Sequence, residues 1–162
     1  MAAIATFSLE TGLRKANVID MQWSQVDLER KCAVAWIHPE QSKNRKGIPV
    51  PLSDVAVSVI RSQVGKCQTH VFSYKGNPVT VVNTKAWKSA LKRAGIDNFR
   101  WHDLRHTWAS WHVQSGTPLN VLQELGAWES VEMVRRYAHL SADHLSAYAR
   151  SMTNNLESVA TN

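Results

Sequence analysis

The stretch Phe99-Arg100-Trp101-His102-Asp103-Leu104-Arg105-His106-Thr107 decides how the rest of the chain is interpreted. It combines aromatic side chains with histidines and arginines in one short segment. If a helix begins near His102, then His102 and Arg105 lie on one helical face, since residues three apart are neighbours on a helix. An imidazole beside a permanently charged guanidinium can bind a phosphate and move a proton near it. A buried helix start with a hydrogen-bonded histidine is the alternative, because His-x-x-Arg is a short and common pattern.

The composition is that of a globular chain with excess positive charge. The chain has 162 residues, of which 44% are hydrophobic and 20% charged. A domain of this size buries about 70% of its unfolded surface. The formal net charge of +6 favours a polyanionic partner such as a nucleic acid. Cys32 and Cys67 are far apart, so we expect reduced thiols in a cytoplasmic protein rather than a disulfide framework.

Apolar periodicity and turn residues predict a mainly helical fold with a small sheet, an α+β class. Val26–Leu28, Cys32–Ile37 and Ile48–Leu52 are expected to form a three-stranded antiparallel sheet. Trp108 and Trp111 are expected to pack against the core. Helices are predicted over Ile4–Glu10, a short segment from Ala16 to Trp23, Ser53–Gln63, Thr80–Ala94, His102–Ser115, Pro118–Leu125, Ser130–Tyr137 and Ser141–Tyr148.

The same pattern predicts one domain over residues 1–152 and a polar, mobile tail over residues 153–162. Met1 to Glu10 resembles a helix entered in its middle, without a capping residue before it. We therefore expect a fragment of a longer protein. No apolar run approaches the roughly 20 residues that a membrane helix needs, so no membrane partner is expected.

Two further basic residues lie at positions suited to chemistry. Arg14 follows Gly12 at the junction of two predicted helices, where a side chain can turn inward. Lys43 lies in Glu40–Gly47, a polar and basic hairpin tip that could carry a lysine to a phosphate or a leaving group. A surface arginine stacked on Trp23 and a solvated turn are the ordinary explanations of these features.

Five short segments complete the pattern: Thr11-Gly12-Leu13-Arg14, Ser42-Lys43 with Val50-Pro51-Leu52 downstream, His102-Asp103-Leu104-Arg105-His106-Thr107, Leu125-Gly126, and Arg136-Tyr137-Ala138-His139. In this order they resemble the catalytic domain of the tyrosine recombinases, the phage integrase family, over nearly the whole chain. Each segment alone is a weak signal. All five in order are a strong one, because independent chance matches multiply.

The resemblance implies a role for each matching residue. Arg14 and Arg105 resemble the two arginines that clamp the scissile phosphate. Lys43 resembles the hairpin lysine that protonates the leaving 5′ oxygen, and His102 the histidine that assists proton transfer at the nucleophile. Tyr137 resembles the nucleophile itself.

The chain departs from the family pattern at two positions. The position usually held by a second histidine after Leu-Gly aligns with Trp128, counted back from Tyr137. Some members use tryptophan there, so Trp128 is a candidate for donating a hydrogen bond from its indole N–H to the phosphate. Asn17 occupies a position that is often acidic in the family, which affects only the support of Arg14.

The resemblance also implies a reaction and its partners. A strand of double-stranded DNA at an attachment-type site is cut to a 3′-phosphotyrosine and a free 5′ hydroxyl, then exchanged without metal, ATP or any cofactor. The work requires a homotetramer on two DNA sites, from a free monomer, in the bacterial cytoplasm at the nucleoid. A further N-terminal part would supply another DNA-binding domain. Lys88 and Lys92, on the polar face of a predicted helix, are candidate phosphate contacts.

A non-catalytic DNA-binding module is the alternative from another class of protein. Pro118–Tyr137 resembles a helix-turn-helix, whose second helix would lie in the major groove and bring Arg135 and Arg136 to DNA. That hypothesis leaves Arg14, Lys43 and His102 without a role. A type IB topoisomerase, which shares the catalytic set, is the enzymatic alternative; the small size and the Tyr-Ala-His segment favour a recombinase.

Other residues compete for the proposed chemistry. A zinc site would use His102 and His106 with His112 or His139, but it lacks the glutamate of His-Glu-x-x-His and any cysteine at a suitable spacing. We therefore expect no metal. Tyr74 and Tyr148 are alternative nucleophiles, but neither lies in an Arg-Tyr-Ala-His segment.

Overall fold

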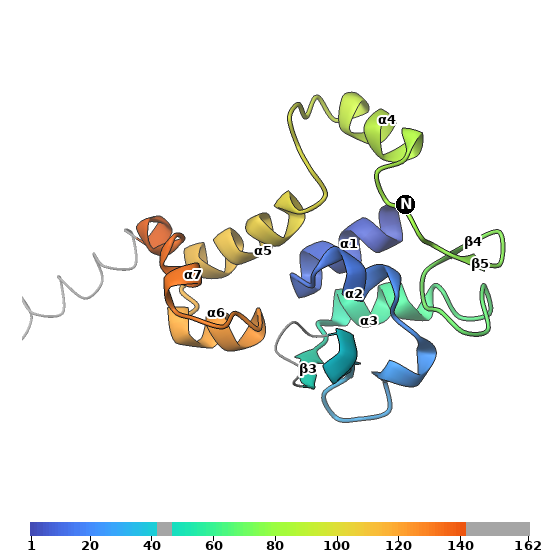
Figure 1. Ribbon diagram of the computed structural model, residues 1–162, viewed down its shortest axis with the longest axis horizontal. Coiled ribbons are helices and arrows are strands. Elements are labelled where there is room, and N and C mark those ends of the chain that lie inside the picture. Colours follow the sequence, from blue (N-terminus) through green and yellow to red (C-terminus); the bar gives the residue numbers. More distant parts are fainter. Residues whose placement is uncertain (42–46, 142–162) are drawn as a thin grey trace, which may run out of the picture. The chain divides into compact units, whose positions relative to one another are not determined.

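The computed structural model describes residues 1–41 and 47–141. The chain divides into two compact units, residues 1–108 and 109–162, which are described separately (Figure 1). Lys43, most of the predicted helix Ser141–Tyr148 and the tail 153–162 lie outside the described residues. None of the described helices is long and apolar enough to span a membrane.

The predicted antiparallel sheet is confirmed in the first unit. Its strands are β1 (Val26–Asp27), β2 (Val34–Ile37) and β3 (Ile48–Pro51), in the order β1-β2-β3. In the central strand, Ala35 pairs with a residue of each neighbouring strand. The edge position of β3 suits its two prolines, which cannot donate to a further strand.

Helices build the rest of the first unit around a continuous apolar core. They are α1 (Ala2–Thr11), α2 (Lys15–Ile19), α3 (Asp54–Arg61), α4 (Lys85–Arg93) and the first part of α5 (Asp103–Gln114). Helix α1 packs against α3, and the rings of Phe7 and Phe72 lie 5.2 Å apart between their centroids. Gly12 ends α1 in the left-handed conformation, at φ 59°, as its sequence predicts.

A second, two-stranded hairpin joins β4 (Ser73–Tyr74) to β5 (Asn77–Pro78). Its two central residues, Lys75 and Gly76, have φ of 51° and 81°. Positive φ at both central positions is the geometry of a type I′ turn, which matches the twist of a tight hairpin. The sequence does not predict this pairing, because each strand has only two residues.

The second unit contains the end of α5, α6 (Leu119–Leu125), α7 (Glu132–Arg135) and a 3₁₀ turn at Ala138–Ser141. Helix α6 packs against α7. The buried apolar side chains in the described part of the second unit are Ala109, Val113, Leu122, Val134 and Tyr137. In the described part of this unit, each helix therefore contributes only one or two buried apolar side chains.

Three predicted helices are shorter than their patterns indicate. The helix predicted from Ala16 to Trp23 ends at Ile19 as α2, and Trp23 begins a separate 3₁₀ turn over Trp23–Gln25. The helix predicted over Thr80–Ala94 begins only at Lys85, because the Thr84 hydroxyl accepts a hydrogen bond from the backbone N–H of Trp87 (3.4 Å) and caps the helix there. The helix predicted over Ser130–Tyr137 is reduced to α7. Trp111, predicted to pack, is 54% exposed.

The cap of α3 provides a test of this fold. The Ser53 hydroxyl accepts from the backbone N–H of Ala56 (3.1 Å) and donates to a carboxylate oxygen of Glu10 (2.5 Å), which ties α3 to α1. Replacing Ser53 by alanine should lower the free energy of unfolding by about 1–2 kcal/mol, measured by urea denaturation. Ser58→Ala, at an exposed position of the same helix, is the control and should change it by less than about 0.5 kcal/mol.

Candidate functional site

Arg105 is a buried cation held by the end of another helix. Its side chain is 6% exposed, and the Nη1 atom donates a hydrogen bond to the backbone carbonyl of Gly12. That carbonyl lies just beyond the C-terminal end of α1, where the helix dipole is negative and favours a positive charge. A buried guanidinium needs such compensation, because removing it from water is costly. The hydrogen bond joins two segments that are 93 residues apart in the sequence.

Gly12 also accommodates a large aromatic side chain. A Cβ atom at this position would lie 2.2 Å from Cε3 of Trp108, far inside contact distance. Trp108 follows Arg105 by one helical turn on α5 and is itself buried. The absence of a side chain at Gly12 therefore lets α5 approach the turn closely enough for Arg105 to reach its carbonyl.

Arg14 lies two residues beyond this turn. It is the N-cap of α2 with an extended backbone, and its carbonyl accepts from the N–H of Val18 (3.2 Å). Its side chain is half-buried, between the fully buried state of Arg105 and open solvent. The structure thus brings the segments of Arg14 and Arg105 together at Gly12.

His102 lies in the turn that precedes α5. It is exposed, whereas its neighbour Trp101 is buried and contacts the ring of Trp87 at 4.7 Å between centroids. The His102 ring meets the ring of His106 edge-on, with centroids 4.9 Å apart and planes at 90°. His102 thus lies just before α5, which begins at Asp103 and carries Arg105, whereas the sequence predicts that the helix begins at His102.

The carboxylate of Asp103 closes the same turn. It accepts from the backbone N–H of Arg100 (2.8 Å) and from Nη2 of the Arg100 side chain (2.9 Å). These hydrogen bonds lower the pKa of Asp103 below its ordinary value, against the opposing effect of burial. The sequence contains the signal for this contact, an acidic residue three positions after the start of a turn, but it assigns no role to Asp103.

Trp128 and Tyr137 lie in the second unit. A Cβ at Gly126 would lie 2.1 Å from the Trp128 indole, so the ring occupies space that only glycine leaves open. Trp128 is also fixed through its backbone, which donates to the carbonyl of Gln123 (3.1 Å) and accepts from the Gln123 amide (3.3 Å). Its ring centroid lies 6.1 Å from that of Tyr137.

Tyr137 follows α7 rather than lying within it. It is 6% exposed, and the guanidinium carbon of Arg136 lies 5.8 Å from its ring centroid. The competing residue Tyr74 is 71% exposed on β4, while Tyr148 lies outside the described residues. Of the two tyrosines that the structure describes, Tyr137 is therefore the one that lies beside Trp128.

The remaining candidates do not form a metal centre in the part of the chain that the structure describes. No group of three or more histidine, cysteine, aspartate or glutamate side chains is placed to hold a metal ion there. His112 instead contacts the Thr117 hydroxyl through Nδ1 (3.0 Å), and its burial lowers its pKa.

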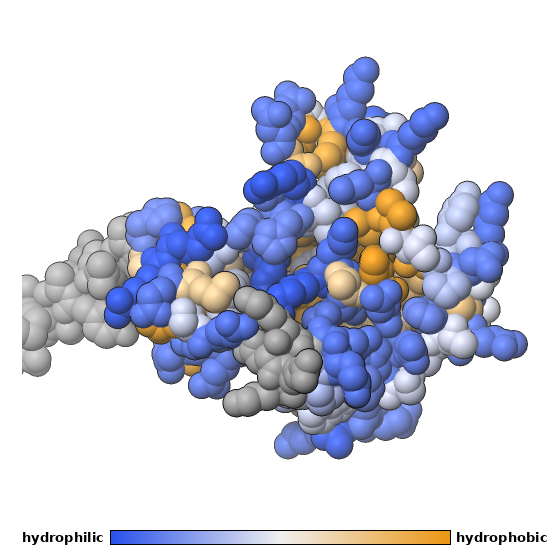
Figure 2. Space-filling model, viewed as in Figure 1, coloured by the Kyte–Doolittle hydropathy of each residue, from blue (hydrophilic) through white to orange (hydrophobic). Residues whose placement is uncertain are grey.

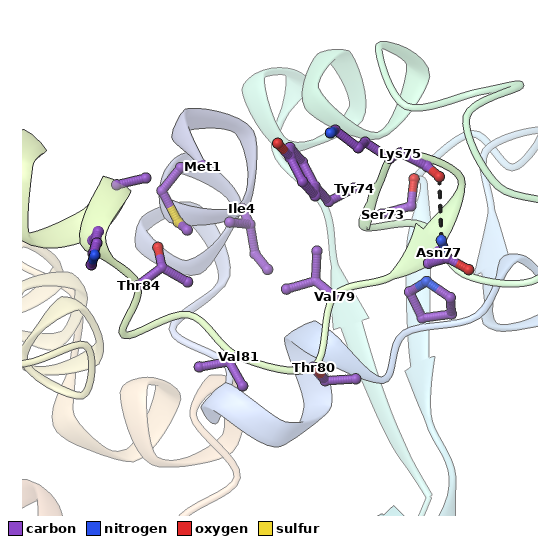
Figure 3. A pocket seen from close by; sticks show the side chains of 13 residues that line it. Met1, Ile4, Ser73, Tyr74, Lys75, Asn77, Val79, Thr80, Val81 and Thr84 are labelled. Atoms are coloured by element: carbon purple, nitrogen blue, oxygen red, sulfur yellow. Dashed lines mark hydrogen bonds between the residues drawn. The ribbon is translucent and has the colours of Figure 1, made fainter.

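An apolar pocket lies elsewhere in the first unit. It is bounded by the start of α1, the β4–β5 hairpin and the segment leading to α4, with Ile4, Val79 and Val81 among its apolar lining residues (Figure 3). Arg14, His102 and Arg105 do not line it. Arg14, His102 and Arg105 therefore lie at a glycine turn and a helix start rather than in this pocket.

Comparison with known proteins places these features in a family. Residues 1–144 match the family model described as the phage integrase family. The chain is 50% identical to the integrase of Salmonella phage P22 over 165 residues, which cover 94% of this chain and 42% of that protein. The chain thus spans less than half the length of this relative.

Solved structures agree with the match. The catalytic domain of bacteriophage HP1 integrase is 25% identical, with a TM-score of 0.66 over 91% of this chain and 79% of that one. The XerH site-specific recombinase, in a post-cleavage complex with its difH substrate, is 21% identical, with a TM-score of 0.68 over 91% of this chain and 44% of that one. The second likeness supports the fold.

The packing of Gly12 against Trp108 can be measured with a matched glycine. Gly12→Ala introduces both an unfavourable positive φ and an overlap with Trp108, so it should destabilise the protein by more than about 2 kcal/mol. Gly65→Ala is the control, because Gly65 has φ +80° but nothing within 4 Å of the added Cβ. It should cost only about 1 kcal/mol. Equal losses in chemical denaturation would show that the contact with Trp108 does not matter.

Proposed function

The chain belongs to the phage integrase family, and on that premise we propose that it cuts and rejoins DNA strands in site-specific recombination, with Tyr137 as nucleophile. The observation that carries the proposal is the hydrogen bond from Arg105 to the Gly12 carbonyl. It brings the segments of two arginines together from distant parts of the sequence, as the binding of one phosphate requires. The proposal assigns the catalytic domain to residues 1–152.

The arginines would act on the charge of the phosphate. When an oxygen attacks a phosphodiester, negative charge gathers on the non-bridging oxygens, and planar guanidiniums can meet it with paired hydrogen bonds. Arg105 is preorganised for this, because its burial and its hydrogen bond to Gly12 fix it before DNA arrives. Donors of this kind are each worth roughly a hundredfold or more in rate. Trp128 would add a donor through its indole N–H.

Proton transfers complete the reaction. The Tyr137 oxygen attacks phosphorus while His102 accepts the phenolic proton, since a phenol with a reference pKa of about 10 is mostly protonated at neutral pH. The bond to the 5′ oxygen breaks, and Lys43 donates a proton to that leaving group. The 3′-phosphotyrosine keeps the energy of the broken bond. A 5′ hydroxyl can therefore attack it and reverse the step without metal, ATP or another cofactor.

The proposed partner is double-stranded DNA at attachment-type sites, bound by a homotetramer that assembles from free monomers. The XerH recombinase, which shares this fold, was solved bound to its palindromic difH substrate, and this supports the proposed partner. The proposed setting is the cytoplasm of a bacterial host, at the nucleoid. The net charge of +6 favours attraction to DNA.

The helix-turn-helix alternative is disfavoured by the length of its second helix. Helix α7 spans only Glu132–Arg135, a single turn, whereas a recognition helix needs several turns to follow the major groove. Arg135 and Arg136 are exposed, but they lie at the end of this short helix. A type IB topoisomerase would share the cleavage step and differ in the exchange of strands between two DNA molecules.

Covalent trapping tests the proposed chemistry. The protein is incubated with a nicked suicide DNA substrate in EDTA, and the adduct is measured on a denaturing gel and mapped by peptide mass spectrometry. The adduct should form on Tyr137, be absent in Tyr137→Phe, and form at least about a hundredfold more slowly in Arg14→Ala. An adduct on Tyr74 would keep the reaction class but remove Tyr137 as nucleophile. DNA binding without any adduct would favour the non-catalytic module.

The lysines of α4 provide a separate test of DNA binding. Figure 2 shows hydrophilic side chains projecting from the α4 region, at the top of the view, and Lys88 and Lys92 are exposed there. If both contact phosphates, the double alanine variant should reduce the slope of log Kd against log salt concentration by about 2. The control removes the same charge at exposed Lys31 and Lys66 and should leave the slope unchanged. An unchanged slope in the first variant would remove α4 from the interface.

A further inference from the structure

The turn before α5 is held at both of its ends. Asp103 accepts from the backbone N–H of Arg100 (2.8 Å), from Nη2 of Arg100 (2.9 Å) and from its Nε (3.3 Å). An acidic residue that reaches back three positions to a backbone N–H is half of a capping box. The arginine side chain adds a charge-assisted contact to it. The turn is therefore fixed by backbone and side chain together.

Backbone hydrogen bonds carry this order into the helix. The N–H of Asp103 bonds to the carbonyl of Arg100 (3.0 Å), Leu104 to Trp101 (3.2 Å) and Arg105 to His102 (3.1 Å). Three consecutive hydrogen bonds between residues three apart therefore fix the backbone around His102. Its side chain is exposed, so its orientation needs a further contact to be restricted.

His106 provides that contact. It lies one helical turn after His102, is half-buried, and meets the His102 ring edge-on at 4.9 Å between centroids. The pKa of Asp103 is lowered mainly by the hydrogen bonds from Arg100, and His106 makes a smaller electrostatic contribution in the same direction. His106 therefore lies against the ring that the turn presents.

We propose that Asp103 and His106 are positioning residues that hold the His102 imidazole in one orientation for proton transfer. The inference rests on the proposed function for the role of His102. Asp103 fixes the backbone from which His102 projects, and His106 limits rotation of its ring. Neither residue needs to touch DNA. The Arg100 contact keeps the Asp103 carboxylate ionised well below neutral pH, because its pKa is lowered; the contact is lost only as pH falls through that lowered value.

Single-turnover cleavage under saturating protein tests Asp103. Asp103→Ala should lower the rate constant for adduct formation at least tenfold, while Kd for DNA stays within twofold. Asp103→Glu should restore most of the rate, because glutamate can also reach back to the Arg100 N–H. The control Asp97→Ala makes the same change of charge at an exposed position and should leave both quantities unchanged. A parallel loss of binding and cleavage in Asp103→Ala would overturn the proposal.

A pair of variants tests the ring contact of His106. His106→Ala removes it and should slow adduct formation at least tenfold. His106→Phe keeps an aromatic edge beside His102 and should recover most of the rate. Equal activity of the alanine variant and the unchanged protein would remove His106 from the positioning role.

The ring signals of His102 give a readout that does not depend on cleavage. In protein labelled with ¹³C and ¹⁵N histidine, assigned through a His102→Gln variant, the His102 ring resonances should shift in Asp103→Ala and not in Asp97→Ala. Circular dichroism checks that each variant is folded. If the unchanged protein forms no adduct, the proposed function fails, but these shifts still decide whether Asp103 positions His102. Unshifted His102 signals in folded Asp103→Ala would overturn the inference.

Discussion

In the first unit, the positive charge of the buried Arg105 side chain has to be compensated by a nearby acceptor. Arg105 is almost fully removed from water, and the carbonyl of Gly12, at the negative end of α1, accepts from its guanidinium. That contact is possible only because Gly12 adopts a positive φ and leaves room for Trp108. One glycine thus ends a helix, admits an aromatic ring and orients an arginine. These three constraints together hold the first turns of α5, which carry Arg105 and Trp108, against the end of α1.

Local signals in the sequence predict much of the fold. Gly12 and Ser53 mark a helix end and a helix start where the structure has them, and the paired prolines of β3 indicate an edge strand. The errors arise where tertiary or local polar contacts override periodicity. Helix α4 begins later in the sequence than the apolar pattern indicates, because the Thr84 hydroxyl accepts a hydrogen bond from the backbone N–H of Trp87 and caps the helix there. Trp111 is exposed, since apolar type alone does not decide which face of a helix is covered.

The sequence proposes residues for the candidate site but does not predict their contacts. The order of motifs leads to Arg14, His102 and Arg105, and the structure brings their segments to one glycine turn and one helix start. No local rule links Gly12 to a guanidinium 93 residues away, because such a contact is decided by packing. The edge-on contact between the rings of His102 and His106 cannot be predicted from the sequence either, because His106 is one histidine among several there.

Trp128 illustrates how a large side chain is accommodated close to the backbone. An indole needs space that most neighbouring residues would fill. Gly126 leaves that space, and the positive φ of Ala127, 50°, turns the chain so that the ring folds back over the glycine. The ring then lies beside Tyr137, at 6.1 Å between centroids. The indole is therefore fixed by its packing against Gly126 and by the backbone contacts of Trp128 with Gln123.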